Sequence, residues 1–297
     1  MRRNHYCDGN PELKLFRGEK LLVMVSLLGF VLGIGIALYI YIFGNVVLPE
    51  GNLERAFSFD VALALFLLSI AAILPLSGLS SRKRSAIRWF FIPAILYAYA
   101  IETIQHFRGI NPRFSKVASN TVESIAGNLF ALDSLLIMIV VVLLAIPFYR
   151  KRQTNERPLV VLGIRYAFLS IMFSFAAGLW MSVLQSRYIG ETGNLIVLHG
   201  LGFHALQTLP LLGWLSEKDH IKKRHPGWLI HVGSLAWTIS ILLISIQTVI
   251  GRSVFEWTAL PIISGIMLII WFSSVVTAVF HLFRSKKVTP DLPAHSD

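Results

Sequence analysis

The sequence contains little cysteine, little acid and few charges of either sign. Cys7 is the single cysteine in 297 residues, which excludes an internal disulfide and any zinc or iron–sulfur site built from several thiolates. Charged residues make up only 14% of the chain, whereas 55% is hydrophobic and the mean hydropathy is +0.66. A soluble domain could not cover its surface with so few charges, so the composition is that of a membrane protein.

Long polar stretches are also missing, which excludes a sizeable soluble domain. A membrane-crossing helix needs about 20 apolar residues, and eight segments meet this length. We therefore predict an all-α polytopic membrane helix bundle over 21–284, between an N-terminal tail, 1–20, and a C-terminal tail, 285–297. The first apolar run exceeds the hydrophobic region of a signal peptide and no small-residue cleavage site follows, so we expect it to remain as a helix. The predicted spans are 21–46, 60–80, 87–108, 126–148, 159–185, 194–215, 228–250 and 258–283.

The net charge of +11 reflects where basic residues lie relative to these spans. Twenty of the 27 Lys and Arg residues fall in the tails and loops of one side, and six fall in the loops of the other. Since positive loops stay in the cytoplasm, both termini are predicted to be cytoplasmic, in a cell (inner) membrane. Orientation thus accounts for the basic residues without nucleic acid, and the lipid bilayer is the partner that we expect.

Ionisable and amide side chains are rare inside the predicted spans, and those present are candidate functional residues. Glu102, Gln105 and His106 share one helix face because they stand at i, i+3 and i+4. Asp133 lies about two turns inside the fourth span, where a carboxylate calls for a histidine, an arginine or a proton. The predicted polar centre of the outer leaflet comprises Glu102, Gln105, His106, Asn128, Asp133, His199, His204 and Gln207.

The spacing of the two histidines in the sixth span does not allow them to bind one metal ion together. His199 and His204 are five residues apart, which is a rotation of about 140° on a helix, so they cannot chelate one ion, and no metal site is assigned. His204 and Gln207 do share a face. His231 and His281 lie near the cytoplasmic ends of the seventh and eighth spans as candidate inner-level ligands. Histidines at two levels are what a pair of b-type haems would need.

A short internal similarity recurs at the outer ends of three spans. A glutamine precedes a glycine by four or five residues in 105–109, 185–190 and 247–251. Glycine there suits a helix C-cap, and the glutamine can bond last-turn carbonyls or a neighbouring helix. The pattern indicates a repeated hairpin plan, although helix capping alone would also explain it.

Two stretches resemble segments of known membrane proteins. His199 to Leu211, His-x-x-x-x-His-Ala-Leu-Gln-x-Leu-Pro-Leu, resembles a signature of uncharacterised bacterial polytopic membrane proteins, and Glu102 to Phe114 is similar to a second segment of that group. This resemblance implies a polar centre on the outer side. Helix number and inward termini are similar to the haem A synthase family, but its Glu-x-x-His-Arg pattern is absent, so this likeness is architectural and assigns no residue.

Several functions fit these features. Histidines at two levels favour redox work linked to haem b or a quinone. A transporter of a proton-coupled or anionic solute is favoured by the carboxylates and imidazoles, which can exchange protons. Three arginines in the loops of the outer side could attract an anion: Arg108, Arg113 and Arg187. An assembly or sensing role needs none of this chemistry. A lipid- or isoprenoid-modifying enzyme lacks support from an aspartate-rich motif or a nucleophile elbow, and whether the chain is an enzyme stays open at this point.

Overall fold

The computed structural model describes residues 15–115, 121–150, 157–218 and 226–286. Within these ranges, eight helices are long and apolar enough to cross a membrane, which confirms the predicted all-α polytopic bundle. The protein is therefore a multi-pass membrane protein. The helices are α1 (Lys20–Phe43), α2 (Leu53–Ile73), α3 (Ser81–Phe107), α4 (Thr121–Arg150), α5 (Pro158–Leu184), α6 (Leu195–Glu217), α7 (Pro226–Val249) and α8 (Ala259–Lys286), with a 3-10 turn η1 (Leu74–Ser77) and strands β1 (Val46–Val47), β2 (Gly51–Asn52), β3 (Tyr188–Ile189) and β4 (Gly193–Asn194).

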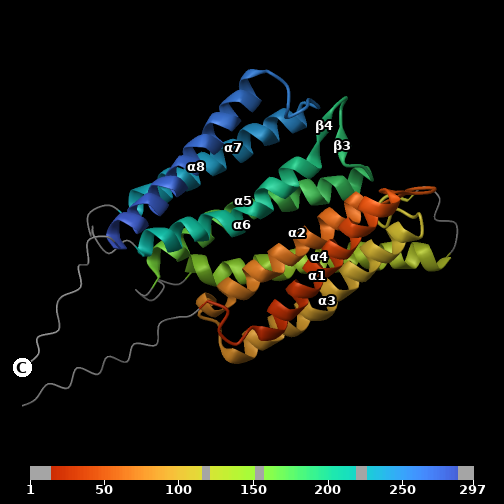
Figure 1. Cartoon of the computed structure of the whole chain (residues 1–297), viewed down its shortest axis with the longest axis horizontal. Helices are drawn as coiled ribbons and strands as arrows, with labels where there is room; N and C mark the ends of the chain where they lie inside the picture. Colours follow the sequence, from red (N-terminus) through yellow and green to blue (C-terminus); the bar gives the residue numbers. More distant parts are fainter. Residues whose placement is uncertain (1–14, 116–120, 151–156, 219–225, 287–297) are drawn as a thin grey trace, which may run out of the picture.

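The bundle has two distinct ends. The start of α1 and the end of α8 lie toward the left of the view in Figure 1, and we call this the termini end. The two β-hairpins lie toward the right, at what we call the hairpin end. Most of the predicted tails, including Cys7, fall outside the described residues.

The central helices approach closely because glycines leave room for backbone. α5 packs most extensively against α6. A side chain on Gly163 would collide with the backbone of Leu209, and one on Gly213 with that of Leu159. This small-residue contact is the usual way for membrane helices to pack, since lipid offers no hydrophobic drive for association. α4 and α8 are the least buried spans and turn most of their apolar surface outward, as lipid-facing helices do.

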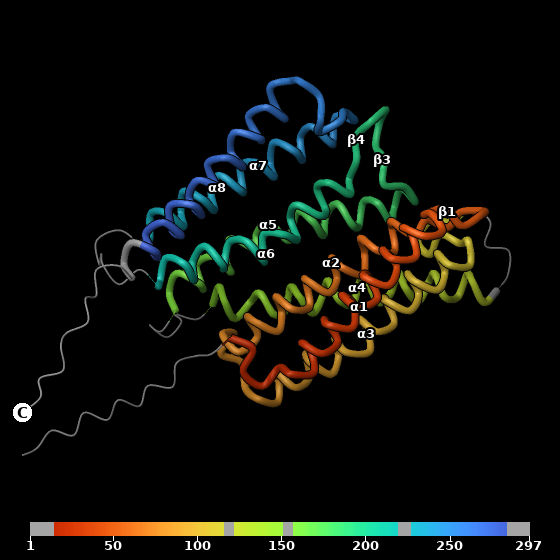
Figure 2. The backbone as a smooth tube through the Cα atoms, viewed as in Figure 1, coloured from red at the N-terminus to blue at the C-terminus, as the bar shows by residue number. Residues whose placement is uncertain are grey.

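The two halves of the chain follow the same plan. The first half runs α1, β1–β2, α2, α3, α4, and the second runs α5, β3–β4, α6, α7, α8 (Figure 2). Each half has four spans, so both cross the membrane in the same sense. Matching residues lie 142 positions apart in both the hairpin and the helix after it: Gly51 and Gly193, Asn52 and Asn194, Gln105 and Gln247, Gly109 and Gly251.

Matching hydrogen bonds join each hairpin to the helix that ends beside it. The N–H of Glu50 donates to the carbonyl of Gly109 at 2.8 Å, and that of Thr192 donates to Gly251 at 3.0 Å. Both acceptor glycines have positive φ, 78° and 77°, a conformation that glycine adopts without steric cost. The repeated plan that the glutamine–glycine pattern indicated thus involves α3 and α7. Gln185 stands apart, because it caps α5 in the left-handed conformation and its amide donates to Ser182.

The two largest errors in the predicted helix starts are at α2 and α3. α2 begins at Leu53 rather than at residue 60, because the side chain of Asn52 accepts the N–H of Arg55 and caps the helix. α3 begins at Ser81 rather than at residue 87. Its basic first turns are held by the buried carboxylate of Glu19, which pairs with Arg84 at 2.7 Å and Arg88 at 2.8 Å.

Candidate functional site

A buried acid–imidazole pair lies at the end of α3. Glu102 and His106 are fully buried, and Oε1 of Glu102 lies 3.2 Å from Nε2 of His106. The other ring nitrogen, Nδ1, accepts the backbone N–H of Asn52 at 3.1 Å. Since a backbone N–H can only donate, Nδ1 carries no proton, and the neutral ring holds its proton on Nε2, facing Glu102. The β1–β2 hairpin therefore fixes the tautomer of His106.

An arginine from the loop after α3 forms an ion pair with Glu102. The guanidinium of Arg113 contacts the carboxylate of Glu102 and lies 5.1 Å from the ring centre of Phe59 on α2. Asn111 positions this loop, because its side chain accepts the N–H groups of Arg113 and Phe114. Such an Asx turn is a local conformation that asparagine favours. The loop thus delivers a cation, still partly exposed, to a carboxylate that is buried.

Asp60 brings a second buried carboxylate to the same place. It is fully buried on α2, and its Oδ2 accepts the hydroxyl of Thr103 on α3 at 2.8 Å. Its Oδ1 has no hydrogen-bond partner among the described residues. Asp60 also interacts electrostatically with Glu102 and Arg113. We call Asp60, Glu102, Thr103, His106 and Arg113 the α2–α3 polar cluster.

Tyr99 lies beside this cluster, one turn further into α3. Its side chain is 1% exposed, and its hydroxyl has no partner among the described residues. Gly29 on α1 makes room for it, because any side chain there would collide with the Tyr99 hydroxyl. The hydroxyl and Asp60 interact electrostatically. Two buried groups, a carboxylate oxygen and a phenol, are therefore available to bind a proton, a water molecule or a solute.

The second half of the chain builds the same corner without these charges. The positions 142 residues after Asp60, Glu102 and Arg113 hold Gly202, Ile244 and Phe255. His106 corresponds to Thr248. A side chain on Gly51 would collide with the backbone carbonyl of His106, and one on Gly193 would collide with that of Thr248. The corner of the second half therefore forms without buried acids at these positions, and the charged cluster distinguishes the first half from the second.

Gln105 belongs to the rim of the cluster. Its side-chain oxygen accepts a hydrogen bond from Arg108 at 3.2 Å, and Arg108 pairs with Glu123 of α4 at 3.1 Å. The outward arginines thus have different roles, since Arg113 reaches the buried carboxylate whereas Arg108 fastens α4 at the surface.

The structure does not join the predicted residues of α4 to this cluster. Asn128 is exposed. Asp133 is half-buried, and its Oδ2 has no hydrogen-bond partner among the described residues. No histidine or arginine pairs with Asp133 within the described ranges, so the ion pair predicted for it is not found there.

His199 bonds mainly to α5. Its Nδ1 lies 2.8 Å from the carbonyl oxygen of Ser174, and its ring packs against Phe203 with centroids 4.8 Å apart. Gly178 leaves the space that the ring occupies. Arg113 of the α2–α3 polar cluster lies within electrostatic range of the ring. His199 therefore fastens α6 to α5 near the cluster.

His204 and Gln207 form a separate contact with α2. Nδ1 of His204 lies 3.3 Å from the Gln207 carboxamide, so the two residues do share a face. The Gln207 carboxamide lies 2.9 Å from the hydroxyl of Ser69. This polar contact joins the two halves, since Ser69 belongs to α2 and Gln207 to α6, and the rings of Phe66 and Phe203 pack beside it at 5.2 Å.

The histidines toward the termini end contact aromatic residues. Nδ1 of His231 lies 3.0 Å from the hydroxyl of Tyr166, and the ring of His281 packs on Phe280. Among the described residues, no group of three or more His, Cys, Asp or Glu side chains is placed to hold a metal ion.

Sequence reasoning missed Asp60, Thr103 and Tyr99. The predicted span 60–80 would put Asp60 at its first residue, but α2 begins seven residues earlier. This carboxylate therefore lies about 10 Å inside the helix at 1.5 Å per residue. The signal was Asn52 followed by Glu54, a capping residue with an acid in the first turn. Thr103 and Tyr99 carry no comparable signal, because hydroxyl groups are common in membrane helices.

Comparisons with models of protein families, with curated proteins and with solved structures find no match to this chain.

Proposed function

We propose that the protein is a proton-coupled membrane transporter in which the α2–α3 polar cluster binds and releases the coupled proton. The observation that carries this proposal is Asp60, a fully buried carboxylate beside the buried pair of Glu102 and His106. One of its oxygens has no hydrogen-bond partner among the described residues. Ionisable groups at such depth are expensive and are typical of proton pathways. Their absence from the matching corner of the second half supports a role other than folding.

The two-part plan of the chain also supports transport. Secondary transporters are often built from repeats, including parallel repeats related by an axis along the membrane normal, with polar sites where the repeats meet. Here α2 carries Asp60 toward the hairpin end and Ser69 further along, where it contacts Gln207 of the other half. Arg113, which is partly exposed, gives an anionic solute a point of attraction next to the buried acids.

Exchange of Asp60 for asparagine tests this proposal. We expect a pH jump across wild-type proteoliposomes on a solid-supported membrane to give a transient current, because the cluster takes up protons. The Asp60→Asn variant should lose at least about nine-tenths of this current, since the amide cannot be protonated in this range. Asp133→Asn is the matched control, and it should keep the current because Asp133 is not joined to the cluster.

The same membranes can then be screened with inorganic phosphate and with mono- and dicarboxylates. A solute that adds current in the wild type but not in Asp60→Asn would identify the substrate class. An equal current in wild type and Asp60→Asn would refute the role of this residue, and loss of the current only in Asp133→Asn would move the proton site to α4.

Redox work with haem b or a quinone is the second candidate, supported by imidazoles toward both ends of the bundle. His106 fits it less well, because Asn52 occupies one ring nitrogen and the proton on the other faces Glu102. An absorbance spectrum of the purified protein, oxidised and reduced, distinguishes the two functions. A Soret band would favour the haem protein.

We further propose that the termini end faces the cytoplasm, as the distribution of basic residues predicts. Cys7 provides the test, because it is the single cysteine and lies in the N-terminal tail. A membrane-impermeant maleimide should leave Cys7 unlabelled in intact cells and label it after permeabilisation. In a Cys7→Ser background, Thr192→Cys in the exposed β3–β4 turn should show the reverse, namely labelling in intact cells. Labelling of Cys7 in intact cells would overturn this orientation.

A further inference from the structure

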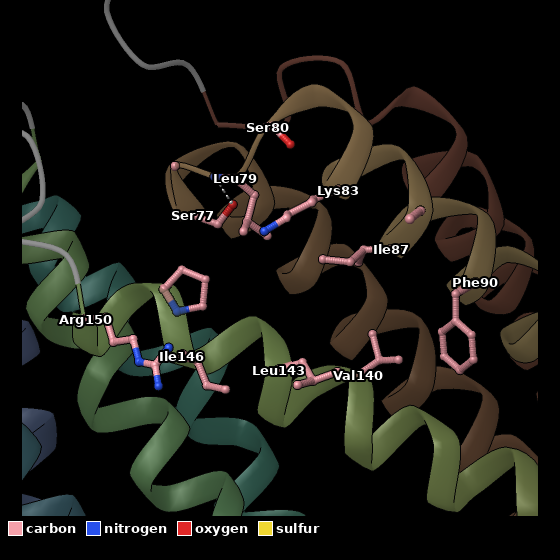
Figure 3. A pocket seen from close by; sticks show the side chains of 13 residues that line it. Ser77, Leu79, Ser80, Lys83, Ile87, Phe90, Val140, Leu143, Ile146 and Arg150 are labelled. Carbon is pink, nitrogen blue, oxygen red and sulfur yellow. Dashed lines mark hydrogen bonds between the residues drawn. The ribbon is translucent and has the colours of Figure 1, made fainter.

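A groove opens between α3 and α4 at the termini end, far along α3 from the polar cluster. Its volume is about 720 Å³. Figure 3 shows Phe90 and Val140 toward one end of the groove, and Ser77, Ser80, Lys83 and Arg150 toward the other. The walls between them are mostly apolar, with Ile87 on α3 and Leu143 on α4. The groove therefore has an apolar body and a basic mouth.

The two cations at the mouth come from different helices. Lys83 lies in the first turn of α3 and Arg150 at the last residue of α4, and both line the groove. Their neighbours Arg84 and Arg88 share the carboxylate of Glu19 as a partner. Within the described part of the chain, by contrast, no hydrogen bond or ion pair engages the side chain of Lys83 or Arg150.

The start of α3 adds hydrogen-bond donors at the same place. Ser80 precedes the helix, lines the groove and makes no capping hydrogen bond through its side chain. The first-turn N–H groups of a helix lack intrahelical partners and favour anions, phosphate in particular. Together with the two cations, this end of the groove suits a phosphate group, whereas the rest suits a hydrocarbon chain.

We propose that this groove binds an anionic phospholipid of the leaflet at the termini end. The phosphate lies between Lys83 and Arg150, and one acyl chain follows the apolar walls past Ile87 toward Phe90 and Val140. Basic pockets between membrane helices are typical sites for anionic headgroups. The apolar body distinguishes this site from one for a free anion, which would leave that surface unoccupied. The site lies apart from the α2–α3 polar cluster, so the two proposals can fail independently.

Native mass spectrometry of the purified protein, titrated with phosphatidylglycerol or phosphatidylcholine, tests the proposal. We expect phosphatidylglycerol to bind the wild type more tightly than phosphatidylcholine. The double variant Lys83→Gln/Arg150→Gln should bind phosphatidylglycerol about 30-fold more weakly, at about 1 kcal/mol for each basic residue. Arg82→Gln is the matched control, because Arg82 lies in the same basic run but does not line the groove. Its affinity should stay close to that of the wild type.

A second variant tests the acyl chain rather than the charge. Val140→Phe fills the apolar body and should weaken binding of phosphatidylglycerol while both cations remain. Equal affinity in the double variant and in Arg82→Gln would overturn the proposal, as would equal affinity of the wild type for the two lipids. Full displacement of phosphatidylglycerol by millimolar inorganic phosphate would also overturn it, because the site would then recognise the anion alone.

Discussion

Exchange of Glu102 for glutamine is expected to lower the free energy of unfolding by about 3 kcal/mol, measured by reversible SDS titration in mixed micelles. Removal of one partner of a buried ion pair costs about 3–5 kcal/mol, because the other charge is left without compensation. We expect the lower part of this range, since Arg113 is 28% exposed and keeps some contact with solvent or headgroups.

Two controls isolate the charge effect. Glu256→Gln removes the acid of the Arg252 pair in the second half, where both side chains are partly exposed, and should cost about 1 kcal/mol or less. The double variant Glu102→Gln/Arg113→Gln should regain part of the lost stability, because no cation is then stranded. If Glu102→Gln lowered the free energy of unfolding no more than Glu256→Gln does, the stabilising role of the buried Glu102–Arg113 pair would be contradicted.

The matching corner of the second half suggests a sharper variant. Glu102→Ile/His106→Thr/Arg113→Phe copies the residues found 142 positions later. Buried ion pairs can often be replaced by well-packed apolar residues without loss of stability. We therefore expect this triple variant to unfold near the wild-type midpoint yet to give a much smaller pH-jump current, which would separate the function of the cluster from the folding of the corner.

The second large effect is expected at Gly109, where alanine should cost about 3 kcal/mol or more in the same titration. The backbone there has φ of 78°, which costs a residue with a side chain about 1–2 kcal/mol. A Cβ would also collide with the carbonyl of Leu48, which belongs to the hairpin. The hairpin would have to move away, and His106 would lose the bond from Asn52.

Glycines elsewhere provide the comparison for this prediction. A side chain on Gly35 would meet nothing within 4 Å, so Gly35→Ala in the middle of α1 should be neutral or stabilise by about 0.5–1 kcal/mol. Gly251→Ala should resemble Gly109→Ala, since its φ is 77° and Gly190 of the second hairpin lies against it. Wild-type stability of Gly109→Ala would show that the hairpin is not held at this glycine.

The class of the fold could be predicted from the sequence, because long apolar runs leave a membrane helix as the simplest way to satisfy backbone hydrogen bonds. Helix starts were predicted less well, since a short capping signal decides them while hydropathy averages over many residues. At α2, Asn52 adds seven residues before the predicted start. Asp60 therefore lies two turns inside α2 rather than at its start, and the packing of the helices buries it fully.

Within the candidate site, sequence spacing correctly predicted which residues of one helix lie together. The depth of residues in the membrane did not predict which residues of different helices are in contact. Glu102 and His106 were placed together because residues four apart share a helix face, and they do lie in contact. Asp133 and His204 lie on other helices, and their depth along the membrane normal does not determine which helix they face. Their partners depend on helix rotation and on which helices are neighbours.

The scarcity of charges and the long apolar runs are enough to predict an all-α membrane bundle with eight spans, and the described residues contain eight such helices. The glutamine–glycine similarity also indicated a repeated plan. The tertiary structure decided which repeats correspond, α3 with α7, and that the buried acids of the described residues at these two corners lie in the first. The physical reason is that burial and electrostatics depend on close approach between segments distant in sequence, such as Asn52 with His106 and Asp60 with Thr103.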